Sequence, residues 1–252
     1  MPILIEACVD SVESSVAAER GGAARVELCD NLLEGGTTPS AGMIEVVRDR
    51  LSIPIYVMIR PRGGDFCYSE MEHEVMLRDV ALAHRLGVDG IAIGALEVSG
   101  AVDARRMSAM IEAARPMSVT FHRAFDVTRD QTDALETLIK IGVDRVLTSG
   151  AKRTAFEGID TIANLVRQAA NRITVIAGAG INEENVKRIV AETGVREIHL
   201  SAAVLHEGRM QHRNDEITFR KQFPPDEYAR WVADSERIRR IGDLLAQSDA
   251  RG

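Results

Sequence analysis

The chain lacks the features that would tie it to a membrane, a secretory route or a nucleic acid. Its apolar runs are all shorter than the roughly 18 residues that a transmembrane helix needs. Its N-terminus has no charged segment followed by an apolar one, as a signal peptide would have. It has no basic run, and its net charge is −7. We therefore expect a cytoplasmic protein that binds neither membranes nor nucleic acids.

Cysteine is also scarce. The three cysteines are Cys8, Cys29 and Cys67, and an odd, low count does not indicate a disulfide framework. We expect free thiols in a reducing compartment. There is no Cys-x-x-Cys, nor a pair of histidines at ligand spacing, so no zinc motif is present. Cys67 lies in a predicted loop and has no assigned role.

What the chain has instead is a regular alternation of short apolar runs and amphipathic stretches. The composition, 45% hydrophobic and 27% charged, suits a globular protein with a substantial core. Helices are indicated after the strands, with Asp10 or Ser11, Ser40 and Ser69 as N-cap residues. The predicted strands lie at residues 4–8, 25–29, 55–60, 90–94, 118–123, 145–148, 173–177 and 197–201.

Eight strand–helix units in 252 residues predict a single-domain α/β fold, a (β/α)8 TIM-type barrel. A doubly wound open sheet is the alternative, but no Gly-x-Gly-x-x-Gly follows the first strand. We expect the barrel to span residues 1–205. Residues 206–252 are predicted to form an irregular loop over 207–222 and a helix over 226–246. That helix either completes the barrel or makes an oligomer contact.

A repeated Glu-x-Cys stands at the ends of the first two strands, as Glu6-Ala7-Cys8 and Glu27-Leu28-Cys29. Side chains alternate along a strand, so each Glu shares a face with its Cys. Working groups of TIM barrels gather at the carboxyl ends of the strands. The two thiols can form a two-coordinate site that suits Cu(I). Packing is the other interpretation, and the stagger between barrel strands can keep the thiols apart.

His122, at the end of the fifth strand, is a candidate general base or metal ligand, with Glu6 or Glu27 as its carboxylate partner. The alternative is a core histidine bonded to one of those carboxylates. We interpret the remaining histidines as structural because they show no paired spacing; they are His73, His84, His199, His206 and His212.

Other polar residues at the strand ends suit an anion. Arg60, Arg62 and Asp65 follow the third strand, and Arg123 follows the fifth. Arginine binds carboxylate or phosphate through its planar fork, although a structural pair with Asp65 or a glutamate is the other interpretation.

The glycines after the seventh strand, Gly178 and Gly180, resemble a phosphate-binding loop that opens a helix, and Ser149 lies after the sixth strand. The alternative for this glycine-rich segment is a tight turn.

Taken together, these segments resemble the CutC family, which is named for copper homeostasis. The resemblance rests on the strings at residues 6–14, 27–29, 33–40, 57–66, 119–126, 147–150 and 177–181. It implies a cytoplasmic TIM-type barrel that forms a homodimer or a larger homo-oligomer, with a role in copper binding and tolerance. It also implies Cys8 and Cys29 as Cu(I) ligands. The chain departs at Ala179, where the family more often has glycine, and matches poorly beyond residue 205.

Two functional hypotheses follow. The first is a cytoplasmic copper homeostasis protein whose ligand is Cu(I), bound by Cys8 and Cys29. The second is an enzyme for a small anionic substrate, phosphorylated or sugar-like. In that enzyme Glu6, Glu27 and His122 would be catalytic. The substrate-binding residues would be Arg60, Arg62, Asp65, Arg123, Ser149, Gly178 and Gly180.

Overall fold

The structure, a computed structural model, describes residues 2–214, 216–217 and 227–249. Eight parallel strands close into a barrel in sequence order, and β1 pairs with both β2 and β8. The barrel strands are β1 (Leu4–Val9), β2 (Arg25–Leu28), β3 (Ile55–Met58), β4 (Gly90–Ile93), β5 (Ser118–Phe121), β6 (Arg145–Thr148), β7 (Thr174–Gly178) and β8 (Glu197–Leu200). The predicted TIM-type barrel is confirmed.

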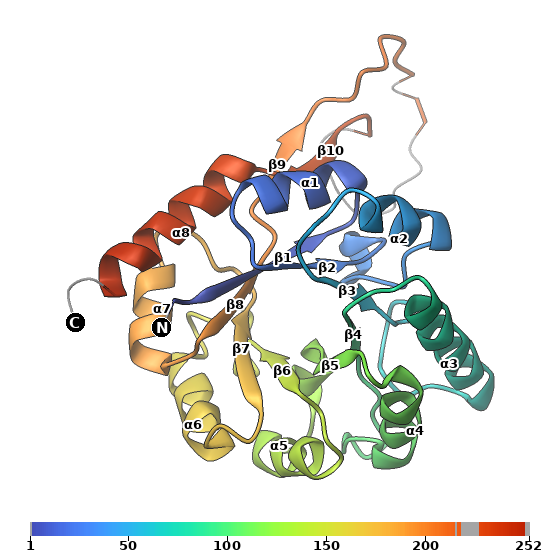
Figure 1. The fold of residues 1–252 in the computed structure, drawn as a ribbon, viewed down its shortest axis with the longest axis vertical. Helices are drawn as coiled ribbons and strands as arrows, with labels where there is room; N and C mark the ends of the chain where they lie inside the picture. The colour runs from blue at the N-terminus through green and yellow to red at the C-terminus, as the bar shows by residue number, and fades with distance from the viewer. Residues whose placement is uncertain (1, 215, 218–226, 250–252) are drawn as a thin grey trace.

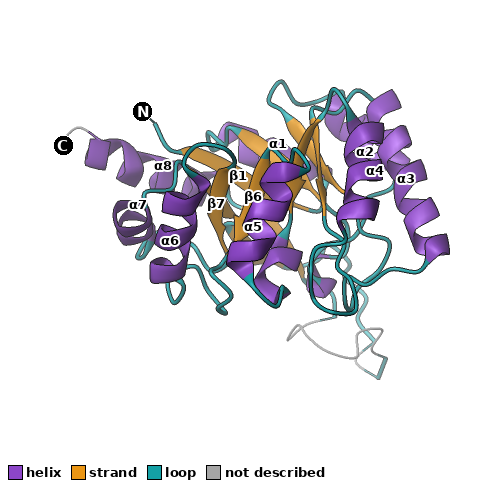
Figure 2. Cartoon of the chain, turned by 90° about the horizontal axis from the view of Figure 1, so that it is seen from below, coloured by secondary structure: helices purple, strands orange, loops and turns teal. Residues whose placement is uncertain are grey.

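Helices form an outer ring around the strands (Figures 1 and 2). They are α1 (Val12–Arg20), α2 (Ala41–Arg48), α3 (Glu70–Arg85), α4 (Ala104–Ala114), α5 (Gln131–Lys140), α6 (Ile159–Ala169), α7 (Val186–Thr193) and α8 (Ser235–Asp249), with short 3-10 turns η1 (Leu32–Glu34) and η2 (Arg123–Val127). The predicted N-caps Ser11, Ser40 and Ser69 accept hydrogen bonds from backbone N–H groups of α1, α2 and α3.

Alternation along the strands separates two layers of side chains. In β1, Ile5, Ala7 and Val9 belong to the hydrophobic core formed with the helices, while Glu6 and Cys8 face the barrel interior. In β2, Val26 and Leu28 belong to the same core. The interior near β1, β2 and β8 is therefore lined by polar side chains.

The chain after β8 differs from the prediction. The expected helix over 226–246 begins only at α8, because Arg230–Ala233 form strand β10. Trp231 and Val232 favour a strand, and β10 pairs antiparallel with β9 (Ala203–His206). Asp234 then caps α8, accepting hydrogen bonds from the N–H groups of Glu236 and Arg237. Residues 218–226, where the predicted loop ends and the predicted helix begins, lie outside the described residues.

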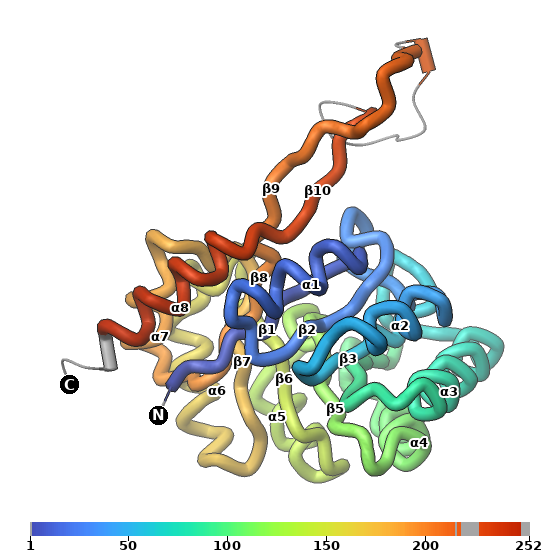
Figure 3. The backbone as a smooth tube through the Cα atoms, turned by 45° about the horizontal axis from the view of Figure 1, so that its top comes forward, coloured from blue at the N-terminus to red at the C-terminus, as the bar shows by residue number. Residues whose placement is uncertain are grey.

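The β9–β10 ribbon extends outward from the barrel, and the two strands lie side by side (Figure 3). Of the expected irregular loop, the described residues 207–214 and 216–217 contain no helix or strand.

The C-terminal helix α8 packs beside α1 and α7, next to the first and last barrel strands (Figure 1). Its contact with α1 is close at Gly21, where an added Cβ would lie 2.7 Å from the Cβ of Ile238. No helix among the described residues is long and apolar enough to cross a membrane.

Candidate functional site

The repeated Glu-x-Cys brings two sulfurs into contact. The register pairs Cys8 with Glu27, so Cys29, which directly follows β2, lies two residues beyond the partner of Cys8. The side chains span this stagger, and Cys8 Sγ lies 3.9 Å from Cys29 Sγ. Cys29 is 1% exposed, and Cys8 is half-buried. Two free thiols therefore meet inside the carboxyl end of the barrel.

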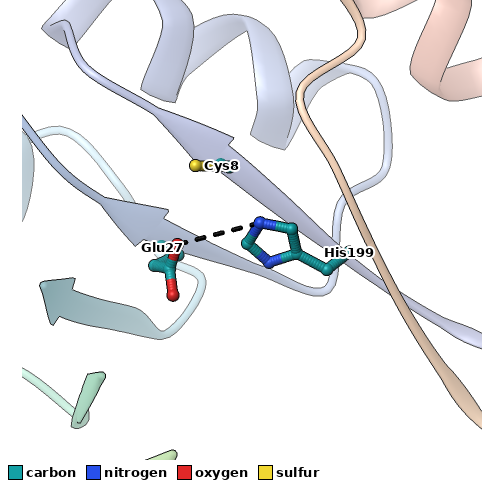
Figure 4. Close-up of side chains that lie close together, drawn as sticks. All are labelled: Cys8, Glu27 and His199. Atoms are coloured by element: carbon teal, nitrogen blue, oxygen red, sulfur yellow. Dashed lines mark ion pairs between the residues drawn. The ribbon is translucent and has the colours of Figure 1, made fainter. Parts of the chain in front are cut away.

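A histidine from the neighbouring strand completes this cluster. Because the barrel closes, β8 lies beside β1, and His199 pairs with Glu6. His199 Nδ1 lies 2.7 Å from Glu6 Oε1, and His199 Nε2 lies 3.8 Å from Glu27 Oε2. Donor atoms of Cys8, Glu27 and His199 lie within 4.8 Å of one another. Figure 4 shows the three side chains converging from β1, β2 and β8.

Below the sulfurs, Glu6 also accepts a hydrogen bond from Arg25, which in turn donates to Glu197. These three residues are at most 7% exposed. Arg25 and Arg145 lie over the ring of Tyr56, with guanidinium carbons 5.1 and 5.3 Å from its centroid. This paired, buried layer holds the Glu6 carboxylate firmly under His199.

The ionisable groups of the cluster shift one another's pKa values. A hydrogen bond from Cys29 is the main cause that lowers the pKa of the Cys8 thiol from 9.0 to about 5, and His199 lowers it further. Donation to Cys8, together with burial, raises the pKa of Cys29 well above 9.0. At neutral pH the pair therefore holds one thiolate, the form in which cysteine binds metals.

The neighbouring acids and the imidazole differ in charge. Burial raises the pKa of Glu27 from 4.5 to about 8. Burial also acts on Glu6, but hydrogen bonds and charges from His199 and Arg25 outweigh it and lower its pKa to about 2. Burial lowers the pKa of His199, yet Glu27, Cys8 and Glu6 together raise it well above 6.5. The metal-free cluster thus pairs a thiolate with an imidazolium, because nearby opposite charges and hydrogen bonds favour the charged form of each group.

A cavity of about 760 Å³ gives access to the cluster. Cys8, Glu27 and His199 line its polar side. Its apolar lining comes from barrel strands, from the loops and from the β9–β10 ribbon, and it includes Leu32, Leu33, Met58, Phe66, Leu147, Ile181 and Trp231. The half-buried sulfur of Cys8 is therefore reached from the carboxyl end of the barrel.

The arginines expected to hold an anion all bind groups of the protein. Arg60 is 5% exposed and donates to the carbonyls of Glu34, Gly36 and Gly64. Its guanidinium carbon lies 4.9 Å from the centroid of Phe66.

Arg62 pairs with Glu72 at 2.6 Å and with Asp65 at 3.2 Å. Arg123 pairs with Asp126 at 2.8 Å and donates to Ser149 Oγ. These contacts match the structural alternative that the sequence left open for Arg62 and Asp65.

His122 does not meet the glutamates predicted as its partners, which instead contact His199. Its Nδ1 accepts a hydrogen bond from the N–H of Ala124, and its Nε2 has no partner among the described residues. Burial, with the charge of Arg60, lowers its pKa from 6.5 to about 3, so the ring is neutral. An added Cβ at Gly94 would lie 2.5 Å from the ring, so glycine makes room for it.

The segment after β7 is a turn rather than a helix N-terminus, since α7 begins only at Val186. Asn185 Oδ1 accepts from the N–H of Asn182, and Asn185 Nδ2 donates to the carbonyl of Gly180. Gly178 lies at the end of β7 against Leu147 and His199. Cys67 is half-buried and is not among the residues that line the cavity.

His199 is the member of the cluster that sequence reasoning missed, since its spacing alone indicates a structural histidine. A signal was present. Glu197-Ile198-His199 on β8 repeats the spacing of Glu-x-Cys on β1 and β2, with a glutamate two residues before a residue of a metal-binding type. Closure of the barrel makes these three strands neighbours in the order β8, β1, β2.

Most of the chain aligns with one family of proteins. The model described as the CutC family matches residues 3–204. The copper homeostasis protein cutC homolog of Mus musculus is 48% identical over 241 residues, which cover 96% of this chain and 89% of that protein. A family protein CutC of Xanthomonas campestris pv. campestris is 54% identical over 198 residues, which cover 79% of this chain and 82% of that protein.

A crystal structure of a CutC protein from Streptococcus agalactiae shares the fold. It superposes with a TM-score of 0.76 at 36% identity and covers 79% of this chain and 98% of that chain. The family match, the relatives and the fold therefore agree.

Proposed function

The chain belongs to the CutC family, and from that premise we propose that it is a cytoplasmic copper homeostasis protein that binds Cu(I) through Cys8 and Cys29 and contributes to copper tolerance. The observation that carries the proposal is the contact of the two sulfurs, 3.9 Å apart at the end of the barrel. Copper is the cargo of such a protein.

The donor set fits a soft monovalent ion. Thiolate sulfur is a ligand type that selects Cu(I). One thiol of the pair is already deprotonated, because the pKa of Cys8 is lowered to about 5. Glu27 Oε1 is buried beside the pair without a hydrogen-bond partner among the described residues. Such an unpaired acceptor favours a cation or a proton at this place.

Access to the sulfurs also suits a protein that takes up and releases its ion. Cys8 lines the cavity, while Cys29 is buried behind it. An incoming thiol or amine ligand can reach an ion on Cys8 first. Exchange of Cu(I) between thiolates then needs no opening of the barrel.

The alternative, an enzyme for a small anionic substrate, has less support. Its proposed anion-binding residues Arg62 and Arg123 pair with carboxylates of the protein, and Arg60 binds three backbone carbonyls. Its proposed acids Glu6 and Glu27 contact His199 rather than His122.

The predicted homodimer or larger homo-oligomer is checked by light scattering of the purified chain.

Anaerobic titration of Cu(I) against a chromogenic competing chelator tests the proposal. Wild type should bind one Cu(I) per chain. The double variant Cys8→Ser/Cys29→Ser should bind at least about tenfold more weakly, the low end of what loss of even an outer-shell group costs a metal site. Cys67→Ser is the matched control, because Cys67 is half-buried but lies outside the cluster. Equal affinity in the double variant and wild type would reject the proposal.

A further inference from the structure

We propose that His199 is a third ligand of the bound Cu(I), so that the ion is held by two sulfurs and an imidazole nitrogen. This inference rests on the proposed function, since it names a further residue of the same site. It makes Glu6 a positioning residue, because Glu6 acts on the ion only through His199.

The first observation is the orientation of the imidazole. Glu6 Oε1 lies 2.7 Å from His199 Nδ1 and is itself fixed by Arg25. A carboxylate on Nδ1 holds the ring and leaves Nε2 as the atom that binds, which is the usual arrangement of metal-binding histidines. Nε2 faces Glu27, 3.8 Å away, and the side of the cluster where Cys8 lies (Figure 4).

The second observation is the separation of the sulfurs. Two metal–sulfur bonds in line would place the sulfurs roughly 4.6 Å apart, taking about 2.3 Å for each bond as in zinc thiolates. The sulfurs of Cys8 and Cys29 are only 3.9 Å apart. If the sulfurs keep this distance, the angle between the two copper–sulfur bonds is bent rather than linear. A bent angle leaves one side of the ion open to a further donor.

The donors on that side are His199 and Glu27, which form one group with Cys8 within 4.8 Å. Imidazole nitrogen suits copper, whereas carboxylate oxygen suits harder ions. His199 is 9% exposed, and its position is set by barrel strand β8 rather than by a loop. The chemistry and the rigidity of the support therefore both favour His199 as the ligand.

The ion and a proton would occupy the same place on the ring. Because Nδ1 is engaged by Glu6, any group bound to the ring on its inner side is bound to Nε2. Ligands must lose their protons to bind a metal, so uptake of Cu(I) here releases protons.

The sequence spacing is the same in β1, β2 and β8: a glutamate lies two residues before each proposed ligand.

X-ray absorption at the copper edge tests the inference on wild-type protein loaded anaerobically with one Cu(I). The near-edge intensity separates two-coordinate from three-coordinate Cu(I), and the fine structure detects the ring atoms of an imidazole. We expect three-coordinate copper with two sulfurs and one imidazole nitrogen. In His199→Gln, which removes the imidazole, the spectrum should become two-coordinate and the affinity should fall at least about tenfold.

His73→Gln is the matched control, because His73 is also a buried histidine but lies on α3, outside the cavity. A thermal unfolding curve of each variant shows whether it is folded. If copper is bound by Cys8 and Cys29 but the wild-type spectrum is two-coordinate and His199→Gln binds as tightly, this inference is wrong and the proposed function stands. If binding does not depend on the cysteines, both fail.

Discussion

Removing the charge of Glu6 should destabilise the metal-free protein by about 3 kcal/mol at pH 7. Glu6 is 1% exposed and is held by Arg25 and His199. Its pKa is lowered from 4.5 to about 2, and 2.5 units at about 1.36 kcal/mol each amount to about 3 kcal/mol. Removing one partner of a buried ion pair lowers the free energy of unfolding by a similar amount, about 3–5 kcal/mol.

The sign of the pH dependence follows from the direction of this shift. A carboxyl whose pKa is lower in the folded state stabilises fully above its unfolded pKa of 4.5. That contribution is lost as the pH falls from 4.5 toward 2. Glu6→Gln lacks the titrating group, so the difference between wild type and variant should shrink to about 2 kcal/mol at pH 3.5.

Urea unfolding at both pH values measures the two differences in the free energy of unfolding. Glu192→Gln serves as the control, because Glu192 forms an exposed pair with Arg188 and its loss should change stability little. A Glu6→Gln variant as stable as wild type at pH 7, or a difference that does not change with pH, would refute the reasoning about the buried layer under His199.

Three further outcomes are expected. Gly21→Ala should lower stability by about 1–3 kcal/mol in urea unfolding, because its Cβ would lie 2.7 Å from Ile238 and push α8 off α1; unchanged stability would mean that the contact is loose. Asp234→Ala should lower the stability by about 1 kcal/mol in urea unfolding, since it removes the cap of α8. Asp234→Asn keeps a side-chain oxygen at this position and should retain most of the wild-type stability. Free Cu(I) at 100 times its dissociation constant should stabilise wild type by about 2.7 kcal/mol in anaerobic thermal unfolding, and stabilisation of Cys8→Ser/Cys29→Ser to the same extent would contradict the proposed ligands.

The barrel could be predicted from the sequence because its signals are local and repeated. Each strand is a short apolar run, and glycines such as Gly87 and Gly142 mark where helices end. The predicted strands agree with the observed ones to within two residues at each end. The family resemblance agreed with these local signals, and both were confirmed.

The β9–β10 ribbon could not be predicted in the same way. Its two strands are separated by more than 20 residues in the sequence, so no short hairpin turn marks them. The stretch that includes β10 therefore merges, in the sequence pattern, with the following helix. What separates the two is Asp234, whose side chain caps α8.

The site was only half predictable, for a topological reason. Cys8 and Cys29 repeat one pattern on strands that are successive in sequence, so a shared site was one of the two interpretations that the sequence allowed. His199 lies 193 residues from Glu6 and meets it only because β8 closes on β1. The side-chain partners of Arg60 and His122 depend on loop conformations that a one-dimensional pattern does not specify.

The most direct test is a crystal structure of the protein grown anaerobically with Cu(I), with an anomalous difference map measured at the copper absorption edge. The account predicts one strong peak within bonding distance of both Cys8 Sγ and Cys29 Sγ, inside the carboxyl end of the barrel. Strong copper peaks elsewhere, with none at these two sulfurs, would contradict it.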